Sequence, residues 1–137
     1  MKEDLIERYA FGVMADGNTM PDIFSHSDQF LIMEMKNRKD ILFEEYRNNP
    51  HTEICSTKYA MPTDLGDPVP EEEEQAYKDM VEIFKDCQCV VGNNLGYAPK
   101  VVIEEAGIFY VMLNGGKFAR DYINGLIEDR AFAGFRD

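Results

Sequence analysis

The stretch QFLIMEMKNRKDILFEEYR, residues 29–47, decides the fold. Two runs rich in large apolar residues, 29–35 and 41–47, flank the polar segment KNRKD. Runs of this kind predict strands, and a connection of about five polar residues predicts an antiparallel hairpin. An earlier apolar run, RYAFGVMAD at 8–16, ends at a DGN turn and predicts one more strand before the hairpin.

The second half of the chain alternates between helical and extended patterns. The segment 71–86 predicts a helix, because Pro70 suits its first turn and four glutamates favour the positive end of the helix dipole. The later elements are expected as a strand at 88–92, a helix ending at Gly107, a strand at 108–113 and a helix at 117–129. The order β-β-β-α-β-α-β-α predicts an α/β fold with a mixed sheet covered by helices.

Length and composition predict one domain. The 137 residues are 45% hydrophobic, enough for a core that extends over about residues 9–129, with a C-terminal tail at 130–137. A net charge of -12 argues against a nucleic-acid partner, and no run approaches the ~20 apolar residues of a membrane span. The first residues lack a signal-peptide pattern, and three cysteines are too few for a disulfide framework, so we expect a cytoplasmic protein.

Strand direction predicts which loops meet. If the first strand runs up, the second runs down and the third, fourth and fifth run up. Four connections then gather at the carboxyl edge of the sheet, where ligands bind in open α/β sheets. These connections are residues 16–28, 48–70, 92–98 and 114–117.

Three of these connections carry candidate ligands. His26 lies in the first, and the pattern H-x-E-x-C in the second offers His51 and Cys55 to a metal. The segment GNNLG in the third offers backbone N–H groups at the start of a helix, which favours an anion. The alternatives are a polar loop at 51–55 and a His26 that bonds only to backbone or Asp28. Cations for an anionic ligand would come from Lys58 and Lys117.

The chain carries no familiar catalytic motif. It has no G-x-S-x-G, P-loop or H-E-x-x-H, so we expect a protein without enzymatic activity. Asp16 and Glu34, near strand ends, leave a metal-dependent hydrolase as a remote alternative. Cys87 and Cys89 are expected to act as small buried hydrophobic residues.

The segments YAFGVMADGNTMPDIFSHSDQFLIMEM (9–35), NNPH (48–51) and FKDCQCVVGNNLGYAPKVVIEEAGI (84–108) together resemble the dinitrogenase iron-molybdenum cofactor-binding family. The resemblance extends from about residue 9 to 128. It implies a ribonuclease H-like fold with a mixed five-stranded sheet of order 3-2-1-4-5, an antiparallel second strand and three helices. The H-F-G loop of the family aligns with Ile23-Phe24-Ser25, so the family's histidine position holds Ile23, and His26 follows three positions later.

The resemblance also implies a function. The better-understood members of the family carry iron-sulfur or iron-molybdenum clusters during nitrogenase cofactor assembly and are not enzymes, and many other members have no known role. We therefore expect a cluster-binding protein in nitrogen fixation, whose partner would be a cofactor-assembly protein. The expected metal ligands are His26, His51 and Cys55, and the expected contacts to the anionic edge of the cluster are Ser25, Gly92, Asn93, Asn94 and Gly96.

A second expectation needs no metal. On the same fold, the loop edge would bind a small molecule or a partner protein as a regulatory module. The tail RAFAGFRD, 130–137, would then either pack on the body or contact another subunit in a homodimer.

Overall fold

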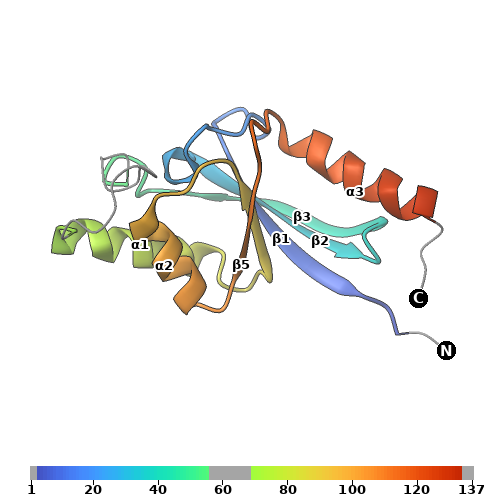
Figure 1. Cartoon of the computed structure of the whole chain (residues 1–137), viewed down its shortest axis with the longest axis horizontal. Helices are drawn as coiled ribbons and strands as arrows, with labels where there is room; N and C mark the ends of the chain where they lie inside the picture. The colour runs from blue at the N-terminus through green and yellow to red at the C-terminus, as the bar shows by residue number, and fades with distance from the viewer. Residues whose placement is uncertain (1–2, 56–68, 134–137) are drawn as a thin grey trace.

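The computed structural model of the chain describes residues 3–55 and 69–133, with the side chains of the last helix as far as Glu128. Five strands form one mixed sheet in the order β3-β2-β1-β4-β5, which confirms the order predicted above (Figure 1). β1 pairs antiparallel with β2 and parallel with β4, and β4 pairs parallel with β5. The strands are β1 (Ile6–Val13), β2 (Gln29–Lys36), β3 (Asp40–Asn48), β4 (Cys89–Gly92) and β5 (Phe109–Met112).

Three α-helices cover the two faces of the sheet. Figure 1 shows α1 (Glu71–Ile83) and α2 (Tyr97–Glu105) on one side and α3 (Ala119–Ala133) on the other. The core accordingly has two layers. The layer under α1 and α2 includes Ala10, Phe30, Ile32, Tyr77, Met80 and Ile103. The layer under α3 includes Phe11, Leu31, Met33, Ala119 and Ile123. Within the described residues, no helix is long and apolar enough to cross a bilayer.

Alternation along the central strands explains the two layers. Successive side chains of a strand point to opposite faces, so β1 sends Ala10 toward α1 and α2 and Phe11 toward α3. β2 does the same with Ile32 and Leu31. The buried parts of both strands, residues 9–13 and 30–33, are therefore apolar on both faces, as expected for the middle of a sheet covered on both sides.

The hairpin is tighter than its polar segment predicts. Lys36 pairs with Asp40, so the turn consists of residues 37–39 instead of the five residues KNRKD. Asn37 and Arg38 reverse the chain with φ angles of 56° and 55°. Such positive φ angles at both central positions match the right-handed twist of the strands, which allows the short connection.

The helix ends also differ from the sequence prediction. α2 begins at Tyr97, and Pro99 fits its first turn because proline has no N–H that needs a partner there. α3 continues to Ala133, so part of the predicted tail is helical. A short 3-10 helix, η1 (Phe24–His26), was not predicted, since three residues give no periodic pattern.

Candidate functional site

Two glycines make room for η1 at the carboxyl ends of the central strands. A Cβ atom on Gly12, near the end of β1, would lie 2.8 Å from the ring of Phe24. A Cβ atom on Gly92, at the end of β4, would lie 2.6 Å from the same ring. Phe24 therefore lies across β1 and β4, where the chain order of the strands reverses and ligands are expected.

The Phe24 ring is held by other aromatic rings of the core. Its centroid lies 5.4 Å from that of Tyr110, 5.7 Å from that of Phe30 and 6.0 Å from that of Phe84. The first and last of these contacts are edge-to-face, the arrangement that aromatic quadrupoles favour. The backbone of Phe24 is also fixed, because its N–H donates to the Asn94 carbonyl at 2.9 Å.

η1 carries two buried polar atoms without partners. Ser25 is fully buried, and within residues 3–55 and 69–133 its Oγ atom has no hydrogen-bond partner. The Nε2 atom of His26, the next residue, is buried and lacks a partner as well. An unsatisfied buried polar group costs about 1–3 kcal/mol, so these two atoms mark a place where an additional group would be stabilising.

Residues 49–55, here called the strap, pack against η1. Asn49 Nδ2 and Thr52 Oγ1 both donate to the Ser27 carbonyl, at 2.9 and 2.7 Å. The Asn49 N–H donates to the Asp28 carbonyl at 3.0 Å. The first and second of the predicted loops therefore do meet at the carboxyl edge.

The strap places His51 and Cys55 in different surroundings. Cys55 is fully buried and packs in the core layer that includes Phe24. Burial, and to a smaller extent the charge of Glu73, raises the pKa of Cys55 to about 12, so its sulfur is a neutral thiol at pH 7. His51 instead lines an open cleft, so these two predicted metal ligands belong to two different environments.

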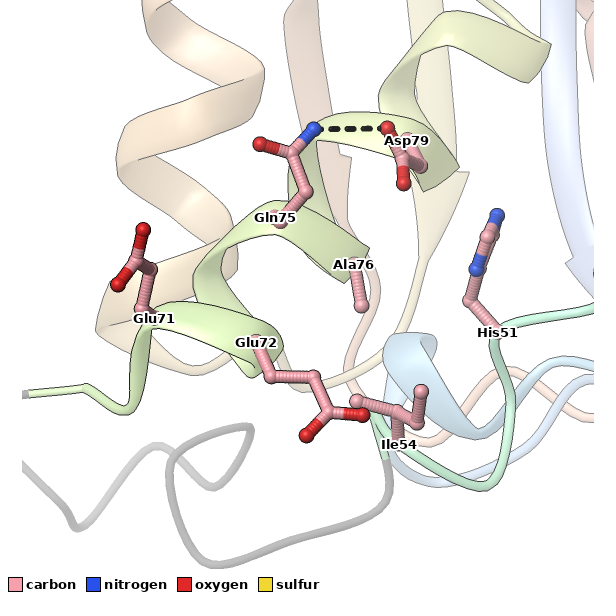
Figure 2. Close-up of a pocket in the computed structure, with 7 residues that line it drawn as sticks. All are labelled: His51, Ile54, Glu71, Glu72, Gln75, Ala76 and Asp79. Atoms are coloured by element: carbon pink, nitrogen blue, oxygen red, sulfur yellow. Dashed lines mark hydrogen bonds between the residues drawn. The ribbon is translucent and has the colours of Figure 1, made fainter.

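The cleft lies between the strap and α1 and has a volume of about 590 Å³. Figure 2 shows His51 and Ile54 of the strap across from the α1 side chains, with Asp79 opposite His51 and Glu72 near Ile54. Gln75 Nε2 donates to Asp79 Oδ1 at 2.9 Å. Three carboxylates line the cleft, so the surface beside the strap is acidic.

The segment GNNLG joins the loops. Asn93 Nδ2 donates to the carbonyls of Pro21 and Gly116, and its Oδ1 accepts from the Gly116 N–H at 2.8 Å. The Asn94 N–H donates to the Asp22 carbonyl. Gly96 is the N-cap of α2 and Gly92 ends β4. The side-chain amide of Asn93 and the backbone N–H of Asn94 are therefore used in hydrogen bonds that hold the loops together, and neither is available to an anion.

The remaining candidates have structural partners. Asp16 Oδ1 accepts from the N–H groups of Asn18 and Thr19, which closes a turn. Glu34 Oε2 forms an ion pair with Arg8 at 3.0 Å. Cys87 is buried after α1, and burial raises its pKa to about 12. Each of these side chains thus has a role in the fold.

The expected metal ligands lie in different surroundings. Among the described residues, no three His, Cys, Asp or Glu side chains are grouped so as to hold a metal ion. Cys55 is buried in the core layer that includes Phe24, whereas His51 lines the open cleft.

Sequence reasoning missed η1, Ser25 as an unsatisfied group and Asn93 as the residue that joins the loops. The available signals were Gly12 and Gly92 near the ends of central strands, since glycine there indicates close approach of another segment.

No family model matches the chain, and no curated protein matches it.

Proposed function

We propose that this protein is a binding module without enzymatic activity, which holds a small molecule at η1 without a metal. The observation that carries the proposal is the pair of buried atoms without partners, Ser25 Oγ and His26 Nε2. They lie at the carboxyl edge of the sheet, where the strand order reverses and where α/β folds bind ligands.

The two side chains suggest what the ligand offers. A serine hydroxyl both donates and accepts, and a neutral imidazole nitrogen does one or the other according to its tautomer. A ligand with a donor and an acceptor close together, such as a carboxamide or a hydroxyl group, would satisfy both atoms. The carboxylates of Glu72 and Asp79 in the nearby cleft oppose a strongly anionic ligand.

The described residues give Ser25 no base that would activate it as a nucleophile. An activated serine needs a hydrogen bond from its hydroxyl to a base. Among the described residues, Ser25 Oγ has no hydrogen-bond partner, so it makes no such bond to His26. The neighbouring Ser27 donates its hydroxyl to the Phe24 carbonyl at 2.6 Å, a contact that holds η1.

Native mass spectrometry of protein purified without oxygen tests the proposal. We expect a bound small molecule on the wild type and on the His51→Ala variant, and its loss from Ser25→Ala and His26→Ala. Because the chain has only two histidines, side-chain ¹⁵N spectra give one pair of signals for each. The His26 signals should move when the bound molecule is removed by dialysis, and the His51 signals should stay.

Two results would overturn the proposal. One is protein of apo mass whose His26 signals are the same before and after dialysis, which would leave only water at the two atoms. The other is uptake of iron and sulfide by the wild type that the His26→Ala, Cys55→Ala double variant lacks. That second result would support a cluster carrier of the kind that the family resemblance implies.

A further inference from the structure

A second region, separate from η1, has an uncovered apolar surface. β5 is an edge strand, and its face toward α3 carries Phe109 and Val111, followed by Leu113 just after the strand. Val111 and Leu113 pack only partly against the α3 layer, and Phe109 is 67% exposed. α3 therefore leaves one side of β5 open to solvent.

A cavity of about 500 Å³ lies where this surface reaches the start of α3. Leu113, Phe118 and Tyr122 give it apolar and aromatic walls, and Phe118 is 42% exposed. Lys117 and Asp121 line the same cavity with opposite charges. Within the described part of the chain, neither of these two side chains makes a hydrogen bond or an ion pair.

The backbone around the cavity is fixed by distant residues. Gly116 exchanges two hydrogen bonds with the Asn93 side chain, and the Lys117 carbonyl accepts from the Met20 N–H at 2.8 Å. The first N–H groups of α3 are satisfied by Asn18, whose carbonyl and Oδ1 accept from Ala119 and Arg120. The cavity is thus preorganised, which lowers the entropy cost of binding.

We infer that this cavity binds a zwitterion with an apolar body, such as an α-amino acid with a large side chain. Lys117 would pair with the carboxylate, Asp121 with the ammonium group, and the aromatic walls would contact the side chain. The volume is in the usual range for small-ligand sites. A zwitterion also avoids the repulsion that a chain of net charge -12 exerts on an anion.

Titration of the ¹⁵N-labelled full chain tests the inference. The probes are L-phenylalanine, 2-phenylethylamine without the carboxylate, and 3-phenylpropionate without the amine. At millimolar concentration, phenylalanine should shift the amide signals of Gly115 and Gly116, and the other two should bind about two- to fivefold more weakly, the loss expected for one exposed charged contact.

Charge-removing variants sharpen the test. Lys117→Gln and Asp121→Asn should each weaken phenylalanine binding about two- to fivefold, whereas Lys100→Gln, on an exposed part of α2, should not. Thermal unfolding of each variant shows whether it is folded. The Ser25→Ala variant should bind phenylalanine like the wild type, so this inference and the proposed function can fail separately.

Three outcomes would overturn the inference. The first is no shift with phenylalanine at millimolar concentration. The second is equal binding of all three probes, which would indicate nonspecific apolar contact. The third is unchanged affinity in both folded variants, Lys117→Gln and Asp121→Asn.

Discussion

A Cβ atom on Gly12 would lie 2.3 Å from the Oγ atom of Ser27. No real Cβ atom approaches an oxygen so closely, so these two residues occupy their positions only because Gly12 has no side chain. The Ser27 hydroxyl in turn donates to the Phe24 carbonyl at 2.6 Å. A glycine in β1 thus fixes the position of η1, the segment that carries Ser25 and His26.

Replacement of Gly12 by alanine should displace η1. We expect the Gly12→Ala variant to lose about 1–3 kcal/mol of unfolding free energy, the usual cost of overpacking a core. The matched control is Gly125→Ala in α3, where a Cβ atom would meet nothing within 4 Å. That control should gain about 0.5–1 kcal/mol, because alanine favours a helix interior. Urea unfolding measures both, and equal stability of the two variants would contradict the packing argument.

Among the polar residues at the carboxyl edge of the sheet, Asn93 should be the one whose replacement destabilises the protein most. The Asn93→Ala variant loses three hydrogen bonds and leaves partners at Pro21 and Gly116 unsatisfied. We expect a destabilisation of about 2–4 kcal/mol from lost bonds and buried unpaired groups. Asn94→Ala is the control, because the Asn94 side chain is exposed and its framework contacts are made by its backbone. A comparable, small effect of both substitutions in thermal unfolding would refute this role.

The Cys55 thiol should be nearly unreactive in the folded protein. Burial raises its pKa to about 12, so at pH 8 only about one molecule in ten thousand carries the reactive thiolate. A variant that retains only Cys55, with Cys87→Ala and Cys89→Ala, should react with Ellman's reagent about a thousandfold more slowly than free cysteine. Denaturation in urea should restore the full rate. Fast labelling of the native variant would mean that the thiol is accessible and ionised, and would contradict this prediction.

Asp86 should contribute stability at neutral pH that is lost in acid. Hydrogen bonds from Arg47, at 2.7 and 3.0 Å, and from Arg8 hold the pKa of Asp86 well below its usual range, against the opposing effect of burial. For a lowered carboxyl pKa, the stabilisation is complete above the unfolded value of about 3.9 and falls as the pH drops from there toward the folded value.

The matched variant is Asp86→Asn. It should cost on the order of 1 kcal/mol at pH 7, since solvent screens this partly exposed group, and the difference from the wild type should shrink below pH 4. Urea midpoints at pH 7 and pH 3 measure the change. A difference that is constant with pH would show that the carboxylate charge is not the cause.

Local pattern was enough to predict most of the fold. The hairpin of β2 and β3 and the helix α1 follow from residues within each segment, and their observed bounds differ from the prediction by three residues or fewer. The sheet order was expected from the family resemblance and is confirmed. η1 was missed, because the φ and ψ angles of a three-residue helix depend on contacts with Gly12, Gly92 and Asn94.

The sequence by itself determined the strands, the helices and the edge at which the loops meet, because hydrophobic periodicity is a property of neighbouring residues. It also indicated His26, His51 and Cys55 as residue types able to bind a ligand. Only the tertiary structure decided that Cys55 is a buried neutral thiol, that His51 faces an open cleft, and that His26 has a buried atom without a partner. Burial and hydrogen-bond satisfaction depend on segments far apart in the chain, which no local pattern records.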